Sequence, residues 1–237
     1  MTRAIVTGGS RGIGHAIARD IVAAGGRVTV TGLDQARLDR AVADLGREGD
    51  AASRVAGARV DMRDRAAVDA LVAGAEQRWG GLDVLVNNAG VGEFEPVESM
   101  TDEQWARVID TNLTGAFFGM RAAIPALRRA GGGWIINIAS LAGRNYFPGG
   151  GAYCASKAGL IALSEAVMQE VRYDRIRVST VMPGSVATEF SGRGAAEGGD
   201  WRLAPDDVAE VVMDLLRHPG RSLPSRIEIR PSMPKKK

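Results

Sequence analysis

Short runs of apolar, β-branched residues alternate along the chain with longer segments of helical period. This alternation is typical of repeated strand–helix units that feed a parallel sheet. It predicts seven strands, over residues 4–7, 27–31, 53–60, 82–87, 134–139, 177–182 and 226–229. Helices are expected to begin near Gly12, Asp34, Asp64, Thr101, Tyr153 and Pro205. The predicted fold class is α/β, a doubly wound, seven-stranded parallel sheet with helices on both faces.

The length and composition favour one folded domain. The chain has 237 residues, of which 45% are hydrophobic and 24% are charged, so a sizeable core is expected. Doubly wound sheets hold this length around a single core. Residues 1–231 are therefore expected to form a single domain, followed by a basic tail over residues 232–237 with no assigned role.

The charge pattern argues against several classes of partner. Lys plus Arg number 30 against 28 Asp plus Glu, and the two signs are interspersed, so neither nucleic acid nor a membrane surface is an expected partner. No stretch reaches the ~20 apolar residues of a membrane span, and the strand-like start leaves no room for a signal peptide. One cysteine, Cys154, suits a reducing compartment. A cytoplasmic location is expected.

A glycine-rich turn follows the first predicted strand. The chain reads TGGSRGIG over residues 7–14 and continues into an amphipathic helix. Gly8 permits a sharp turn, Gly12 lets the backbone approach a pyrophosphate, and Gly14 allows tight packing of helix on sheet. The N-terminus of the helix presents unpaired N–H groups to an anion. A plain strand-to-helix turn is the alternative, but the context favours a dinucleotide site.

A second candidate site combines a serine, a tyrosine and a lysine. Ser140 closes a predicted strand, and Tyr153 and Lys157 are four residues apart, which places both on one helix face. A phenol with a pKa near 10 needs a neighbouring cation if it is to exchange protons at neutral pH. Lys157 would be that cation and is expected to lower the pKa of Tyr153. Ser140 would donate a hydrogen bond to a substrate oxygen while Tyr153 transfers the proton.

These motifs together resemble the short-chain dehydrogenases and reductases, a family with a Rossmann-like fold. The resemblance rests on the turn over residues 7–14, NNAG over 87–90, Asn112 within DTNL, Ser140, and YCASK over 153–157. It implies a hydride transfer between a nicotinamide cofactor and a small carbonyl or alcohol substrate. The implied catalytic residues are Asn112, Ser140, Tyr153 and Lys157, with Asn112 holding a water in a proton relay.

The resemblance also implies a set of cofactor contacts. Asp61 would hydrogen-bond the adenine, Lys157 the ribose, and Thr188 the carboxamide of the nicotinamide. The residues expected to bind the cofactor are Gly8, Ser10, Arg11, Gly12, Ile13, Gly14, Asp61, Asn88, Ala89, Gly90, Tyr153, Lys157, Pro183, Gly184 and Thr188.

The end of the second predicted strand bears on the choice of cofactor. Gly32 stands where NAD-preferring members of the family carry an aspartate, so the carboxylate that would repel a 2′-phosphate is missing. Arg11 resembles the basic residue that NADP-preferring members place beside that phosphate. Leu33 lacks a second positive charge, and Asp34 is expected to cap the following helix. We expect a preference for NADP(H) over NAD(H).

The substrate stays open at this stage. It is expected in loops at the carboxyl ends of the strands, where Phe94, Tyr146, Phe147, Phe190 and Trp201 would give aromatic walls, although core packing explains each equally well. Residues 189–200 are expected to form a mobile lid. The resemblance implies a homodimer or homotetramer. No metal site is expected, because the two histidines stand apart from other ligands. A catalytically inactive dinucleotide-binding regulatory protein is the alternative function.

Overall fold

The structure is a computed structural model and describes residues 1–47, 50–190 and 201–234. Its seven strands form one parallel sheet in the order β3-β2-β1-β4-β5-β6-β7, which confirms the predicted fold class. The strands are β1 (Arg3–Val6), β2 (Arg27–Gly32), β3 (Val55–Arg59), β4 (Val84–Asn87), β5 (Gly133–Ile138), β6 (Ile176–Pro183) and β7 (Arg226–Ile229). The order reverses at β1 and β4, and the predicted lid falls largely on residues 191–200, outside the described residues.

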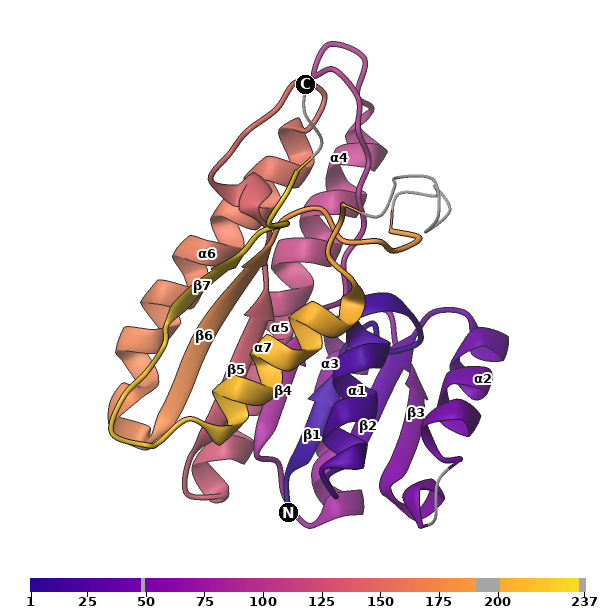
Figure 1. The fold of residues 1–237 in the computed structure, drawn as a ribbon, viewed down its shortest axis with the longest axis vertical. Coiled ribbons are helices and arrows are strands. Elements are labelled where there is room, and N and C mark those ends of the chain that lie inside the picture. Colours follow the sequence, from indigo (N-terminus) through magenta and orange to yellow (C-terminus); the bar gives the residue numbers. More distant parts are fainter. Residues whose placement is uncertain (48–49, 191–200, 235–237) are drawn as a thin grey trace.

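Helices cover both faces of the sheet (Figure 1). They are α1 (Gly12–Ala23), α2 (Gln35–Leu45), α3 (Arg65–Trp79), α4 (Asp102–Ile109), α5 (Gly115–Arg129), α6 (Gly151–Val171) and α7 (Pro205–Arg217). Two apolar cores result. One packs α1, α2 and α7 against the sheet through residues such as Ile17, Leu38 and Val212, and the other packs α3, α5 and α6 through residues such as Leu71 and Leu160.

Local signals in the sequence fix where several helices begin. Asp34 caps α2 by accepting a hydrogen bond from the N–H of Arg37 at 2.9 Å, as expected. Thr101 and Gln104 form the predicted capping box at the start of α4. The helical run from this box continues to Arg129, but a five-residue π-helix, Asp110–Thr114, separates α4 from α5. This interruption was not predicted.

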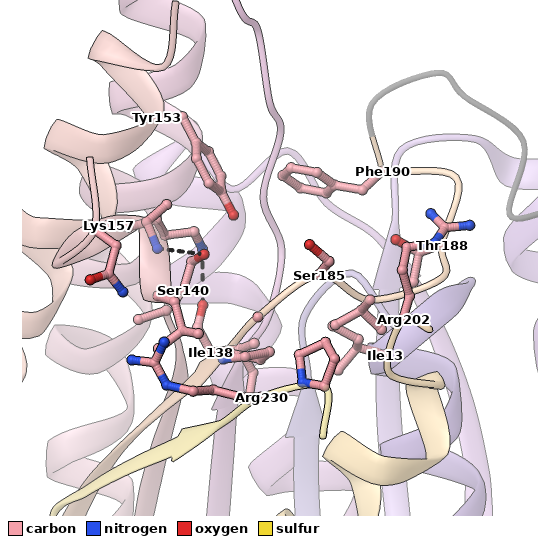
Figure 2. Close-up of a pocket in the computed structure, with 18 of the residues that line it drawn as sticks. Ile13, Ile138, Ser140, Tyr153, Lys157, Ser185, Thr188, Phe190, Arg202 and Arg230 are labelled. Carbon is pink, nitrogen blue, oxygen red and sulfur yellow. Dashed lines mark hydrogen bonds between the residues drawn. The ribbon is translucent and has the colours of Figure 1, made fainter. Parts of the chain in front are cut away.

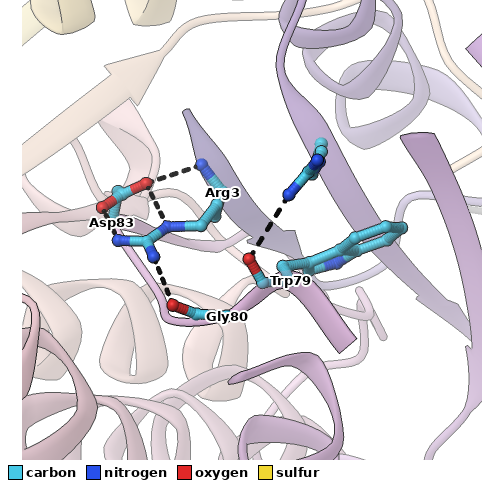
Figure 3. Close-up of polar contacts among 5 residues, drawn as sticks. Arg3, Trp79, Gly80 and Asp83 are labelled. Carbon is cyan, nitrogen blue, oxygen red and sulfur yellow. Dashed lines mark hydrogen bonds and ion pairs between the residues drawn. The ribbon is translucent and has the colours of Figure 1, made fainter. Parts of the chain in front are cut away.

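The amino-terminal edge of the sheet is closed by paired charges (Figure 3). The guanidinium of Arg3 donates to both carboxylate oxygens of Asp83, at 2.8 and 2.6 Å, and also to the carbonyl of Gly80. The guanidinium of Arg27 donates to the carbonyl of Trp79. These contacts stabilise the amino-terminal edge. An open parallel sheet binds its ligands at the opposite edge, which the carboxyl ends of the strands form.

Candidate active site

Two adjoining cavities lie along the carboxyl edge of the sheet. The β1–β2 cavity, of about 790 Å³, lies over the ends of those strands and the start of α1. The β5–β6 cavity, of about 830 Å³, lies over the ends of β5 and β6 and the start of α6. Both are lined by Ile13, Asn88, Thr188 and Phe190, so the two share a wall. Their arrangement suits a long ligand with two halves.

The glycine-rich turn is shaped by close backbone approaches. Gly8 has a φ of 64°, and a Cβ there would lie 2.9 Å from the Cα of Ala89. A Cβ on Gly14 would lie 2.5 Å from the carbonyl oxygen of Gly8. Side chains at either position would push the turn away from the sheet. The turn therefore keeps its backbone at the mouth of the β1–β2 cavity, as the spacing predicted.

The segment after β4 is tied to the same turn by hydrogen bonds. The hydroxyl oxygen of Thr7 accepts bonds from the N–H groups of Asn88 at 2.9 Å and Ala89 at 3.0 Å. The side-chain amide of Asn88 donates to the carbonyls of Thr7 and Gly8, at 2.9 and 3.2 Å. These bonds hold the glycine-rich turn and the NNAG segment together as one rigid floor between the two cavities.

The N-terminus of α1 has no side-chain cap, unlike those of α2, α3 and α4. Asp34, Asp64 and Thr101 each accept a backbone N–H at the start of α2, α3 and α4. Arg11, the N-cap of α1, makes no such side-chain bond, and the first turn of α1 has no acidic residue. Its N–H groups thus remain available for an anion in the β1–β2 cavity. The residues present fit the pyrophosphate of a dinucleotide.

The predicted cofactor residues mostly line the two cavities. Those in the β1–β2 cavity are Gly8, Ser10, Arg11, Gly12, Ile13, Asp61, Asn88, Ala89, Gly90 and Thr188. The β5–β6 cavity contains Tyr153, Lys157, Pro183 and Gly184, and repeats Ile13, Asn88 and Thr188. Gly14 lies behind the turn, where it packs against Gly8 and Asn88.

Two of these residues are engaged by other side chains. The guanidinium of Arg11 donates to a carboxylate oxygen of Glu189 at 2.9 Å, and both side chains are about half exposed. The carboxylate of Asp61 accepts bonds from the guanidinium of Arg63, which lowers the pKa of Asp61. A bound nucleotide would meet both pairs at the wall of the β1–β2 cavity.

Ser140, Tyr153 and Lys157 meet in the β5–β6 cavity (Figure 2). Ser140 follows β5, and its hydroxyl oxygen accepts the N–H of Ala142 at 3.1 Å. The first turn of α6 points the hydroxyl of Tyr153 into the cavity. Lys157, one turn later, lies beneath, with Nζ 5.8 Å from the centre of the Tyr153 ring. The sequence spacing thus brings these three together as predicted.

Burial shifts the pKa values of Tyr153 and Lys157 in opposite directions. It raises the pKa of Tyr153, an effect that a hydrogen bond with the Ser140 side chain opposes. Burial lowers the pKa of Lys157 to about 8, and its ammonium donates to the carbonyl of Ile138 at 2.9 Å. The prediction that Lys157 lowers the pKa of Tyr153 is therefore wrong. Desolvation raises this pKa by more than the Ser140 hydrogen bond lowers it, and the ammonium of Lys157 donates to the backbone instead of to the phenol.

Asn112 lies behind the cavities, in the π-helix between α4 and α5. Its side-chain oxygen accepts the N–H of Val91 at 2.8 Å, and its amide donates to the carbonyl of Val91 at 2.9 Å and to the hydroxyl of Ser156 at 3.1 Å. The hydroxyl of Ser156 in turn donates to the carbonyl of Tyr153 at 2.8 Å. Asn112 thus connects the segment after β4 to the helix that carries Tyr153.

Several residues of the site were missed by the sequence analysis. Ser156 is completely buried and completes the link from Asn112 to Tyr153. Arg37, in the first turn of α2, and Arg63, after β3, both line the β1–β2 cavity. The position of Arg37 could have been inferred, since it stands three residues after the N-cap Asp34. Phe94 and Phe190 were expected to line the pocket, but the contact of their rings with that of Tyr153 has no signal in the sequence.

The part of the chain that the structure describes shows neither a metal-binding cluster nor a helix suited to a membrane. No cluster of three or more His, Cys, Asp or Glu side chains in this part of the chain could hold a metal ion. Likewise, among the helices over residues 1–47, 50–190 and 201–234, none has both the length and the apolar character to cross a bilayer.

Comparison with known proteins decides the family. The family model described as short chain dehydrogenase matches residues 2–197. The chain belongs to the short-chain dehydrogenase family. A relative in the family, the NADP-dependent 3-hydroxy acid dehydrogenase YdfG of Salmonella typhi, is 33% identical, and the match covers 96% of this chain and 94% of that protein.

Solved structures of short-chain dehydrogenases share the whole fold. An alcohol dehydrogenase from the archaeon Thermococcus sibiricus, complexed with 5-hydroxy-NADP, superposes with a TM-score of 0.92 at 29% identity, covering 100% of this chain and 99% of that one. A metagenomic short-chain oxidoreductase in complex with NADP gives 0.85 at 36% identity, covering 98% of each chain. The protein is an oxidoreductase that transfers hydride between a nicotinamide cofactor and its substrate.

Proposed function

We propose that this short-chain dehydrogenase reduces small ketones, and oxidises the corresponding secondary alcohols, with NADP(H) as its cofactor. The observation that carries the proposal is the meeting of Ser140, Tyr153 and Lys157 in a cavity that adjoins the one beside the glycine-rich turn. When bound, the nicotinamide supplies a hydride to the carbonyl carbon, which leaves the oxygen in need of a proton. The chain supplies that proton.

Tyr153 is the proton donor in this proposal. Because burial raises its pKa, the phenol is protonated at neutral pH and can give its proton to the carbonyl oxygen during reduction. The hydroxyl of Ser140 stabilises the same oxygen as negative charge develops on it. The phenolate left on Tyr153 then regains a proton from solvent. In the oxidation direction the same groups act in reverse order.

Lys157 stabilises the phenolate while it exists. Its pKa of about 8 keeps most of the ammonium charged at neutral pH, and its position beneath the Tyr153 ring places that charge on the cavity side of α6. The same ammonium would hold the ribose of the nicotinamide half. Asn112 serves as a positioning residue, and the family resemblance adds a water held beside it in a proton relay.

The preference for NADP(H) rests on charge in the β1–β2 cavity. Arg11, Arg37 and Arg63 line it, and Gly32 offers no carboxylate to repel a 2′-phosphate. The carboxylate of Asp34 is held in the cap of α2. The cofactors named for the Salmonella relative and for both structural neighbours are NADP or its derivative, which supports the same choice.

We further propose a cytoplasmic protein that assembles as a homodimer or homotetramer through α4, α5 and α6. Trp105 on α4 and Phe117 on α5 are 47% and 39% exposed, and burial between copies would cover them. Residues 1–231 would form the single domain of each copy, with residues 232–237 as its tail. Sedimentation at micromolar concentration tests the assembly, and a monomer would contradict it.

The function is tested with a panel of ketones and alcohols. NADPH oxidation, followed by absorbance, should appear with several ketones and disappear in the Tyr153→Phe variant. A failure of every carbonyl compound to oxidise NADPH, with the cofactor bound, would overturn the proposal and favour an inactive regulatory protein.

A further inference from the structure

Three of the five phenylalanines of the chain form one cluster of rings with Tyr153. They are Phe94 after β4, Phe147 before α6 and Phe190 after β6, and we call them the aromatic wall. The ring centres of Phe94 and Phe190 each lie 5.6 Å from that of Tyr153, and Phe147 lies 5.8 Å from Phe94. All three line the β5–β6 cavity with Ser140. Segments far apart in sequence thus bring apolar rings to the proton donor.

Two glycines lie where any side chain would collide with these rings. A Cβ on Gly92 would lie 2.7 Å from the ring of Phe190 and 2.9 Å from that of Phe94. A Cβ on Gly150 would lie 2.5 Å from the ring of Phe147. Each ring of the aromatic wall therefore packs directly on a glycine. An alanine at Gly92 would displace a ring from its place beside Tyr153, and an alanine at Gly150 would displace Phe147 from its contact with Phe94.

The wall leaves apolar surface uncovered at the mouth of the cavity. Phe94 and Phe147 are each 43% exposed, and Figure 2 shows Phe190 and Tyr153 pointing toward one another across the cavity. Rings prefer edge-to-face or offset contacts with other rings at such spacings. A ligand that covers these surfaces with apolar atoms would gain from removing them from water.

Two cations of the same cavity, Lys157 and Arg230, already bind oxygens of the protein. Lys157 donates to the carbonyl of Ile138, and Arg230 donates to a carboxylate oxygen of Glu228 at 2.6 Å. Figure 2 places Arg230 beyond Ser140 as seen from the Tyr153 hydroxyl, and Arg202 on the side of Thr188. A substituent that reaches the wall from a carbonyl carbon beside Tyr153 meets rings there. A carboxylate in that position would lose part of its hydration against apolar rings.

We propose that the aromatic wall selects ketones and secondary alcohols that carry an aryl, or a similarly bulky apolar, substituent on the reacting carbon. The proposal rests on the proposed function, since it takes Tyr153 as the proton donor. The reaction is unchanged: the hydride goes to the carbonyl carbon, the Tyr153 proton goes to its oxygen, and NADPH is oxidised to NADP⁺.

Steady-state reduction of three probes with NADPH tests the selection. Acetophenone, acetone and acetoacetate present an aryl, a methyl and a carboxylate-bearing substituent. We expect kcat/KM for acetophenone to exceed those for the other two by at least about tenfold, as burial of one ring implies. Phe94→Ala and Phe190→Ala should each lower the ratio of acetophenone to acetone several-fold. Tyr173→Ala, at the far end of α6 and 91% exposed, is the control that should leave the ratio unchanged.

Each contrary result has a distinct meaning. Faster reduction of acetoacetate than of acetophenone, or Phe→Ala variants that speed reduction of acetophenone, would overturn the inference while leaving the proposed function intact. If no probe is reduced, the proposed function fails. Calorimetric binding of acetophenone to the NADP⁺ complex then still decides the inference: tighter binding than acetone supports the wall, and equal or absent binding contradicts it.

Discussion

The β1–β2 cavity is lined by four arginines and three carboxylates, whereas the adjoining β5–β6 cavity places three phenylalanines around one tyrosine. The charges differ in exposure as well. The side chain of Arg11 is 46% exposed, but Lys157 is 4% exposed. Exposed charges are screened and individually weak, so the first cavity needs several of them. In the second, burial alone shifts the pKa of one ammonium to about 8.

The carboxyl edge of the sheet therefore holds a charged, exposed region beside a buried, mostly apolar one. In the proposed function, an anionic nucleotide would be recognised by several paired charges that can change partners. Proton transfer is assigned to a few buried groups whose pKa values depend on exclusion of water.

Tyr153→Phe should lower kcat for ketone reduction by about 10³-fold or more, in the range of a lost general acid. The ring and its contacts with Phe94 and Phe190 remain, so the dissociation constant for NADPH should change less than about twofold. Stopped-flow turnover and fluorescence titration measure the two effects. Tyr146→Phe, an exposed tyrosine of the loop before α6, is the matched control. Retention of full turnover by Tyr153→Phe would remove Tyr153 from the chemistry.

Arg11→Ala should reduce kcat/KM with NADPH by about 10- to 100-fold, the effect of one charge-assisted hydrogen bond to a phosphate. Reaction with NADH, which has no 2′-phosphate, should change little. Arg19→Ala is the control, because Arg19 on α1 pairs with Asp20 and Asp206 instead of lining the β1–β2 cavity. Equal losses with both cofactors would show that Arg11 acts on the turn rather than on the phosphate.

Lys157→Met should abolish turnover and weaken cofactor binding, yet raise the free energy of unfolding of the cofactor-free protein. The pKa of Lys157 falls from 10.5 to about 8 on folding, so the folded state disfavours its charge by roughly 3 kcal/mol below pH 8. Loss of the hydrogen bond to Ile138 reduces this gain by about 1 kcal/mol. Methionine should therefore stabilise by about 1–3 kcal/mol at pH 7.

The pH dependence checks the sign of that prediction. The unfolded chain holds the Lys157 proton up to pH 10.5, whereas the folded chain releases it near pH 8, so the penalty fades as pH rises across that window. The advantage of Lys157→Met in urea unfolding should shrink between pH 8 and 10. A gap that stays constant over this range would show that packing, not charge, sets it.

Glu189→Gln should have the smallest effect, a two- to fivefold lower KM for NADPH. The carboxylate of Glu189 pairs with Arg11 and adds negative charge to the cavity, but at 60% exposure its influence is screened. The amide removes the competition for Arg11 and the repulsion of the phosphates. Comparison with NADH separates the two, since only the first is specific to a 2′-phosphate. A raised KM for NADPH would indicate that Glu189 helps to hold the cofactor.

The sequence predicted those features that depend on local chemistry. The seven strands, the turn at Gly8 and the caps at Asp34 and Thr101 follow from residue type and spacing within a few positions. Tyr153 and Lys157 share a face because of the helical repeat alone. These signals operate over a single turn or strand, so they can be read without knowledge of the rest of the chain.

Other features depend on packing between distant segments and could not be predicted. The π-helix that holds Asn112 depends on its contacts with Val91 and Ser156. The upward direction of the Tyr153 pKa depends on burial, which spacing does not reveal. Phe94, Phe147 and Phe190 were expected to line the pocket, but their meeting in one aromatic wall depends on three loops that pack over Gly92 and Gly150.

The central claim is that the two cavities form one site for direct hydride transfer, completed by the Tyr153 proton. The test is to reduce a ketone with NADPH in which deuterium replaces both hydrogens on C4 of the nicotinamide. We expect one deuterium on the carbinol carbon of each product molecule, detected by mass spectrometry, and no such product from Tyr153→Phe. Product formed without deuterium on that carbon would contradict it.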